Sequence, residues 1–125
     1  MKKTILLLIF FLSLFHSEAQ PASPQEDNRF PQRENTLRIM SYNIHHGRGM
    51  DDTVDIERIG KLILAVNPEV VGLQEVDSMT NRSGNIDIIQ LLSEQTGMYA
   101  TFGYSILHDG GKYGNGMLTD RKSVV

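Results

Sequence analysis

Residues 37–77 read LRIMSYNIHHGRGMDDTVDIERIGKLILAVNPEVVGLQEVD, and this stretch decides the fold. Residues 37–44 alternate between two faces that are both partly apolar, which predicts a strand covered on both sides. Residues 55–66 repeat apolar side chains at spacings of three and four, which predicts a helix with one apolar stripe, and Asp55 can cap its start. Residues 69–73 (EVVGL) predict a second, buried strand. The order strand, helix, strand therefore predicts a βαβ-like unit of an α/β fold.

The rest of the chain is expected to add one more helix and a hairpin. Residues 85–96 predict a helix that Gly97 ends in the left-handed conformation. Residues 98–103 alternate as a strand. Residues 104–118 then resemble a hairpin, in which residues 108–111 (HDGG) supply the turn.

The composition is that of an ordinary globular protein, and it excludes several kinds of chemistry. Hydrophobic residues make up 40% of the 125-residue chain and charged residues 22%, so no low-complexity or fibrous class fits. The formal net charge of -3 gives no sign of a surface that binds polyanions. The chain has no cysteine, which excludes disulfides, thiolate metal ligands, a cysteine nucleophile and a lipid anchor on an N-terminal cysteine.

The N-terminus has the pattern of an export signal. Two lysines precede an apolar run over residues 5–15, and small residues then lead to Ala19. The alternative is a transmembrane anchor, but the run is shorter than the roughly 20 apolar residues that span a bilayer. We therefore expect cleavage after Ala19 to remove residues 1–19, leaving a secreted or periplasmic protein with no transmembrane segment. Residues 20–36 are then expected to form an exposed lead-in.

Residues 120–125 (DRKSVV) follow the point at which a strand should finish or turn. Their back-translation as GATCGGAAGAGCGTCGTG matches a common sequencing adapter. We therefore expect these residues to be non-native read-through, with native sequence ending near Thr119. The alternative is a genuine basic terminus.

Polar side chains directly follow both strands of the βαβ-like unit. Glu75 comes after an apolar run, where a buried unpaired carboxylate would be costly but a strand-end carboxylate can point into a cleft. A hard divalent cation such as Mg²⁺ needs one or two protein oxygens at such a place, with water and substrate phosphate completing its shell. The alternative is a solvated glutamate at a strand end. Asn43, at the end of the first strand, could bind a ligand, and the alternative is that its side chain closes a turn.

Three further side chains near these strand ends have open roles. His45 and His46 are compatible with acid/base groups, phosphate ligands or solvated loop residues. Adjacent histidines make a poor metal pair in a strand, because neighbouring side chains point to opposite faces. Arg82 lies close to Glu75 in the sequence, and its guanidinium could bind a phosphate in bidentate fashion. The alternative for Arg82 is an exposed loop arginine.

LRIMSYNIHHG (residues 37–47) followed by PEVVGLQEVD (residues 68–77) resembles the opening of the endonuclease/exonuclease/phosphatase superfamily. This superfamily includes DNase I, exonuclease III, sphingomyelinases and inositol-polyphosphate phosphatases. GKYGNGMLT (residues 111–119) is similar to the family's third stretch, so the resemblance covers residues 37–119. It implies the N-terminal part of a four-layer α/β sandwich (DNase I-like) with two central, mainly antiparallel sheets, truncated in this chain.

The resemblance also implies roles for individual residues. Glu75 resembles the principal metal carboxylate of the family, and Asn43 resembles the asparagine that contacts the metal site and orients phosphate. Both would be catalytic and metal-binding residues, with Mg²⁺ or Mn²⁺ as the cofactor. Asn115 falls on the third stretch and would lie on the substrate side, where His45 and Arg82 are further candidates for substrate binding.

Two departures from the family pattern bear on the substrate. Exonuclease III-like members have an aspartate where this chain has His45, which disfavours that branch. Asp77 replaces a basic residue that DNase I places near the minor groove, which weakens a duplex-DNA interpretation. The sequence SYNIHHGRGMD (residues 41–51) is more similar to exported bacterial members and to the C-terminal domain of the calcofluor-white-hypersensitivity protein. We expect a phosphoester substrate, with a small or lipid phosphodiester favoured over nucleic acid, and a monomer at full length.

The family completes its site with G-D-x-N and S-D-H motifs, and neither occurs in this sequence. In the family mechanism an activated water attacks phosphorus in line while metal and histidine stabilise the developing charge. The sequence therefore predicts a divalent-metal-dependent phosphoester hydrolase of phosphodiesterase, phosphatase or nuclease type, present here without its base. On its own the chain is expected to be inactive and poorly folded. The alternative is a secreted, non-catalytic binding module on the same fold.

Overall fold

The computed structural model describes residue 31 and residues 34–120. Its elements follow the chain in the order β1 (Ile39–Asn43), η1 (His45–Gly47), α1 (Ile56–Val66), β2 (Val70–Ser78), η2 (Asn81–Ser83), α2 (Ile88–Thr96), β3 (Tyr99–His108) and β4 (Gly111–Thr119). The predicted signal peptide, most of the predicted lead-in and residues 121–125 lie outside the described residues. Asp120 is described, and its N–H donates to the Glu69 carbonyl at 2.8 Å.

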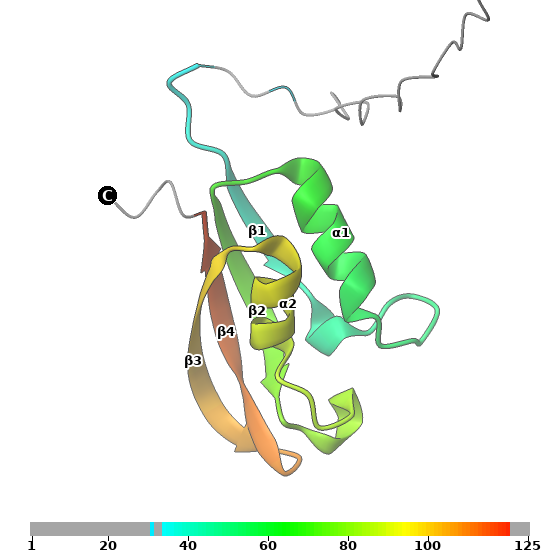
Figure 1. The fold of residues 1–125 in the computed structure, drawn as a ribbon. Helices are drawn as coiled ribbons and strands as arrows, with labels where there is room; N and C mark the ends of the chain where they lie inside the picture. The colour runs from blue at the N-terminus through cyan, green and yellow to red at the C-terminus, as the bar shows by residue number, and fades with distance from the viewer. Residues whose placement is uncertain (1–30, 32–33, 121–125) are drawn as a thin grey trace, which may run out of the picture.

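The four strands form one mixed sheet in the order β1-β2-β4-β3 (Figure 1). β1 runs parallel to β2, whereas β4 is antiparallel to both β2 and β3. The connection between the parallel neighbours β1 and β2 contains α1, so the predicted βαβ-like unit is confirmed. β2 is longer than predicted, because its pairing with β4 continues beyond Glu75 to Ser78.

α1 forms where the sequence predicts it because both of its ends are capped. Asp55 Oδ1 accepts a hydrogen bond from the Arg58 N–H at 2.9 Å. At the other end Asn67 takes the left-handed conformation with φ of 51°, and its N–H donates to the Ile63 carbonyl at 2.9 Å. The apolar stripe of the helix is buried against the rest of the domain, as Ile59 and Ile63 show.

α2 begins at Ile88, whereas the sequence predicts a start at residue 85. Asp87 is the reason for the later start. Its Oδ1 accepts an N-cap hydrogen bond from the helix at 3.3 Å, and its Oδ2 accepts a hydrogen bond from the Ser78 hydroxyl at 3.2 Å. Gly97 ends the helix with φ of 70°, as predicted.

β3 and β4 form a hairpin from two long strands. β3 is continuous, so the strand predicted over residues 98–103 and the first arm of the predicted hairpin are one element. Asp109 and Gly110 form the connecting turn, with φ of 47° and 84°. Positive φ at both central residues is the type I′ geometry, whose twist matches that of the flanking strands.

Both helices lie on one face of the sheet (Figure 1), and this is the α/β architecture that the sequence predicts. The buried residues that join helices and sheet include Ile63, Leu73, Leu92 and Leu118. Side chains alternate along a strand, so the neighbours of these residues point to the opposite face. Large exposed apolar residues of that face include Ile39, Tyr99 and Met117. Within the described part of the chain, no helix is long and apolar enough to cross a membrane.

Candidate metal centre and substrate pocket

The parallel pairing of β1 and β2 brings Asn43 beside Glu75. Asn43 pairs with Gln74 in the ladder, so Glu75 lies directly past the end of β1. Asn43 Nδ2 donates to Glu75 Oε1 at 2.7 Å, and Asn43 Oδ1 accepts the His45 amide N–H at 3.0 Å. The second bond fixes the amide orientation, because only oxygen can accept from an N–H. In this arrangement Asn43 therefore orients the Glu75 carboxylate as a hydrogen-bond donor.

A β-bulge gives the Glu75 side chain its direction. Leu73 pairs with Gly116 and Val76 pairs with Gly114, so Gln74 and Glu75 together face one residue of β4. That one residue is Asn115, the exposed side chain that the family resemblance places on the substrate side. Glu75 has φ of 58°, which L side chains rarely adopt. Bulges of this kind re-aim a side chain and often lie next to active sites.

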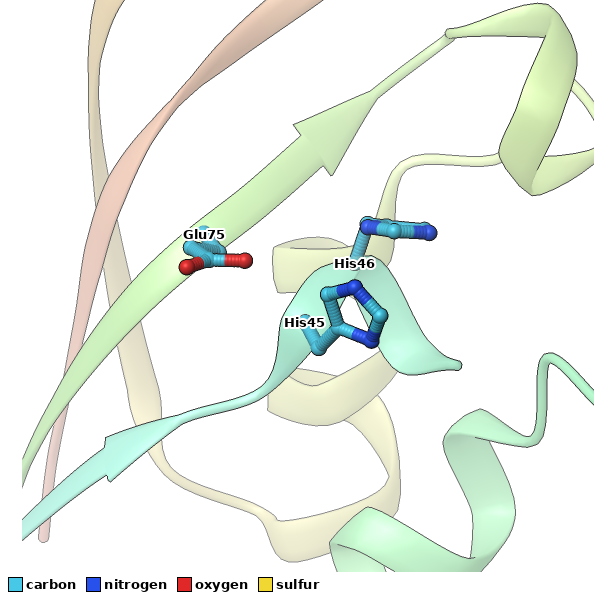
Figure 2. Close-up of side chains that lie close together, drawn as sticks. All are labelled: His45, His46 and Glu75. Carbon is cyan, nitrogen blue, oxygen red and sulfur yellow. The ribbon is translucent and has the colours of Figure 1, made fainter. Parts of the chain in front are cut away.

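The tight turn η1 after β1 brings both histidines towards Glu75. His45 and His46 have φ of 46° and 45°, and their ring centroids are 4.5 Å apart. Figure 2 shows both imidazoles on this turn, beside the strand that carries Glu75. Ligand atoms of the three side chains lie within 4.8 Å of one another. The argument against a pair of adjacent histidines holds in a strand, and it does not apply here because the chain leaves β1 before His45.

His46 is buried and is held in its neutral form. Its side chain is 7% exposed. Burial, followed by the positive charges of Arg82 and His45, lowers the pKa of His46, and the opposing effect of Asp77 is smaller. A neutral imidazole is the form that ligates metal ions or accepts a proton. The sequence left several roles open for His46, and the structure makes it a candidate residue of the site.

Arg82 is held by a buried partner, Asp77. Arg82 Nε donates to Asp77 Oδ2 at 2.7 Å, and Arg82 Nη2 donates to Oδ1 at 2.8 Å. Thr80 Oγ1 donates to Asp77 Oδ2 at 2.6 Å. Burial by itself raises the pKa of Asp77, but the hydrogen bonds from Arg82 and Thr80 outweigh it and the pKa is lowered. Asp77 is therefore an anion that neutralises Arg82.

This pairing changes two interpretations of the sequence. Arg82 is neither a free loop arginine nor a guanidinium with its full fork open to phosphate, because two of its nitrogens bond Asp77. Among the described residues its Nη1 has no hydrogen-bond partner, so the two N–H groups of this nitrogen remain for a ligand. Asp77 is 0% exposed and does not line the pocket, so its own charge does not face a ligand there.

A pocket with a volume of about 170 Å³ opens over these groups. Its lining residues are His45, His46, Glu75, Arg82, Ile106, His108 and Tyr113. The β3–β4 hairpin contributes Ile106, His108 and Tyr113, which the sequence interpretation missed. A signal existed for Tyr113, because it lies two residues before Asn115 and alternation places the two on one face. Asn115 itself is not among the residues that line the pocket.

The fold and the pocket together define a mixed α/β domain with a candidate metal centre at its strand ends. A sequence profile of the family described as "Endonuclease/Exonuclease/phosphatase family" matches residues 40–123. Because this match covers more than half of the chain, the chain belongs to that family, as the sequence motifs predict.

Solved structures agree with this assignment. The endonuclease/exonuclease/phosphatase from Beutenbergia cavernae is 25% identical with a TM-score of 0.53, and the match covers 66% of this chain and 25% of that one. A family protein from Leptotrichia buccalis is 19% identical with a TM-score of 0.53, and the match covers 67% of this chain and 38% of that one. The chain thus spans well under half of the length of these relatives. No curated protein matches it.

Proposed function

We propose that this chain carries the metal-binding end of the active site of a divalent-metal-dependent phosphoester hydrolase. The observation that carries the proposal is the placement of Glu75. A bulge aims its carboxylate into a pocket that also contains two imidazoles and a guanidinium. Membership of a family of phosphoester hydrolases supports the same class of reaction for this chain.

Mg²⁺ or Mn²⁺ is the proposed cofactor, and the Glu75 carboxylate fits such an ion. Glu75 offers one carboxylate, and Mg²⁺ commonly takes one or two protein carboxylates and completes its shell with water and substrate phosphate. Asn43 would hold that carboxylate in place through its 2.7 Å hydrogen bond. A bound divalent cation supplies Lewis acidity towards a phosphoryl oxygen.

The remaining polar groups would bind the phosphoester. Arg82 offers the N–H groups of its Nη1 from a position that Asp77 fixes, so they can donate to a phosphate oxygen at little cost in side-chain entropy. His45 is exposed at the pocket edge, and Asn115 lies opposite the Glu75 bulge. The roles of His45, Arg82 and Asn115 in substrate binding stay predictions.

A small or lipid phosphodiester is the proposed substrate, ahead of duplex DNA. Duplex DNA requires a groove with several basic side chains, and the chain has a formal net charge of -3. The pocket offers one guanidinium and the partly apolar surfaces of Ile106 and Tyr113. We further propose that the protein is exported to the periplasm or the medium, because residues 1–19 have the pattern of a signal peptide. A monomer at full length stays a prediction.

The test uses the purified product of the intact gene. We expect it to hydrolyse a soluble phosphodiester such as bis(p-nitrophenyl) phosphate, to lose this activity in EDTA and to regain it with Mg²⁺ or Mn²⁺. Sphingomyelin vesicles, inositol phosphates and supercoiled plasmid are tested in parallel. Plasmid nicking with no turnover of the lipid or inositol substrates would reverse the substrate preference.

The DNA downstream of residue 119 provides a second test. A hydrolase needs groups that activate water, and the family supplies them from G-D-x-N and S-D-H motifs that residues 1–125 lack. We expect both motifs in the intact gene. A gene that lacks both would contradict the hydrolase proposal and leave a binding module on the same fold.

A further inference from the structure

We infer that the metal centre includes both imidazoles: His45, His46 and Glu75 form a three-ligand set that selects a borderline transition cation such as Zn²⁺ over Mg²⁺. The inference deepens the proposed function and rests on it for Glu75 as a metal ligand. It adds two nitrogen ligands, and it therefore replaces Mg²⁺, which fits Glu75 alone, with an ion that also binds imidazole nitrogen.

The geometry of the three side chains is close to that of a metal site. Their candidate ligand atoms lie within 4.8 Å of one another. Ligands at about 2.0–2.2 Å from one ion lie roughly 3.0–3.5 Å apart, so the set must close by about 1.5 Å. The His45 ring is exposed at the pocket edge and is free to supply this movement by rotation.

The backbone provides an independent observation. His45, His46 and Glu75 have φ of 46°, 45° and 58°, so all three proposed ligands are in the left-handed region. This conformation is costly for a non-glycine residue and accumulates at ligand sites, where the surrounding structure maintains it. Here the hydrogen bonds of η1 and the β4 pairing maintain it, and they hold two side chains of one turn and one side chain of β2 close together.

Hydrogen bonding also leaves the right nitrogens free. His45 Nδ1 lies 3.4 Å from the Arg48 carbonyl oxygen, which can only accept, so in the neutral ring this contact favours the tautomer with the proton on Nδ1 and Nε2 open to a metal ion. A hydrogen bond from the other ring nitrogen to a backbone carbonyl is characteristic of metal-ligating histidines. Within the described part of the chain the His46 ring makes no hydrogen bond, although its side chain is only 7% exposed.

The donor set decides which ions fit. Mg²⁺ takes oxygen ligands, whereas imidazole nitrogen suits Zn²⁺ and its first-row neighbours. Two histidines and one glutamate are also a ligand set of catalytic zinc sites, in which a remaining position stays open to water or substrate. Arg82 and Tyr113 line the same pocket as the three ligands. Of the two ions proposed above, the imidazoles favour Mn²⁺ over Mg²⁺, and they favour Zn²⁺ over both.

The test is a binding measurement on the intact gene product. Isothermal titration with Zn²⁺ and with Mg²⁺ should show Zn²⁺ bound at least about 100-fold more tightly. His45→Ala should weaken Zn²⁺ binding by about 100-fold or more with little change for Mg²⁺. His108→Ala is the matched control, because His108 lines the same pocket but is outside the three-ligand set, and it should keep the wild-type Zn²⁺ affinity.

A second measurement needs no variant of the buried His46. In imidazole NMR spectra, Zn²⁺ should shift the ring signals of His45 and His46 and leave those of His108 unchanged. Equal affinities for the two ions, or unshifted His45 and His46 signals, would overturn the inference. Glu75→Gln separates this failure from that of the proposed function. If Glu75→Gln still binds all divalent cations, the proposed function fails as well. If Glu75→Gln loses divalent binding but Zn²⁺ does not shift the His45 and His46 signals of the unchanged protein, only the inference is overturned.

Discussion

At the residue scale, two ion pairs of this chain differ in what surrounds them. Asp77 is 0% exposed and its partner Arg82 is 34% exposed, whereas Asp51 and Arg58 are 54% and 47% exposed. The hydrogen bond from Arg58 lowers the pKa of Asp51 to about 2. A lowered carboxyl pKa means that any stabilisation from this pair is present above the ordinary carboxyl range and is lost as the pH falls through about 2. Solvent screening keeps that contribution small.

Asp77→Asn is expected to lower the free energy of unfolding of the intact gene product by about 2–4 kcal/mol. The substitution keeps the shape of the side chain but leaves the partly buried Arg82 charge without its anion. Denaturant titration measures the effect. Asp51→Asn, which breaks the exposed pair, is the matched control and should change little. Equal effects of the two variants would show that the Asp77 pair is only a surface contact.

Glu75→Gln is expected to lower activity by about 10² or more while the fold is retained, because it removes the charge that holds the cation. Turnover at limiting Mg²⁺ or Mn²⁺ measures the loss. Glu57→Gln is the control, since Glu57 is an exposed carboxylate of α1 that pairs with Lys61. Near-wild-type turnover of Glu75→Gln would show that Glu75 is merely a strand-end carboxylate.

At the scale of elements, the site depends on how closely β4 packs between its neighbours. β4 pairs with β2 on one side and with β3 on the other, and the Glu75 bulge lies opposite its centre. A Cβ added at Gly114 would lie 2.1 Å from the Gly103 carbonyl oxygen. The close approach of two backbones beside the bulge therefore requires glycine at this position.

Gly114→Ala is expected to lower the free energy of unfolding by about 1–3 kcal/mol, because β3 and β4 would have to separate. The loss of register should also displace the bulge and weaken metal binding at Glu75. Gly103→Ala is the control in the same pair of strands, because a Cβ at Gly103 meets no atom within 4 Å. Thermal melts of both variants measure the difference. An unaltered melting temperature for Gly114→Ala would contradict the close approach.

At the scale of the whole molecule, the sheet is covered on one side. α1 and α2 bury the face that carries Leu73 and Leu118, whereas Ile39 and Met117 on the other face are 67% and 44% exposed. β1 and β3 are the outer strands of the described sheet. Exposed apolar side chains and unpaired strand edges are both aggregation hazards. This arrangement supports the expectation that the chain is poorly folded on its own.

Residues 20–119 expressed alone should therefore aggregate or unfold without cooperativity. A denaturant melt followed by circular dichroism, with light scattering for the aggregation state, provides the measurement. Met117→Lys should increase the solubility of this piece, because it places a charge on the exposed face. Leu118→Lys, the adjacent substitution on the buried face, should not. A sharp transition from a soluble monomer of the unchanged sequence would show that the uncovered face is tolerated.

The sequence by itself determined the local elements and the two residues at the strand ends. Periodicity and end caps depend on neighbours a few positions away, which is why α1, the Gly97 stop and the βαβ-like order could be predicted. Asn43 and Glu75 could be singled out because a polar side chain directly after an apolar run is costly to bury without a partner. The late start of α2 escaped prediction because the Asp87 side chain also accepts a bond from Ser78 of β2.

Only the tertiary structure decided what surrounds Glu75. The β4 pairing creates the bulge. The left-handed turn after β1 brings two imidazoles to one side, whereas a strand would have placed them on opposite faces. Asp77 and Arg82 are five positions apart, yet their pairing depends on the course of β2 and η2. Tyr113 and Ile106 reach the pocket through the hairpin. Bulges, register and backbone strain arise from contacts between distant segments, and no local pattern in the sequence encodes them.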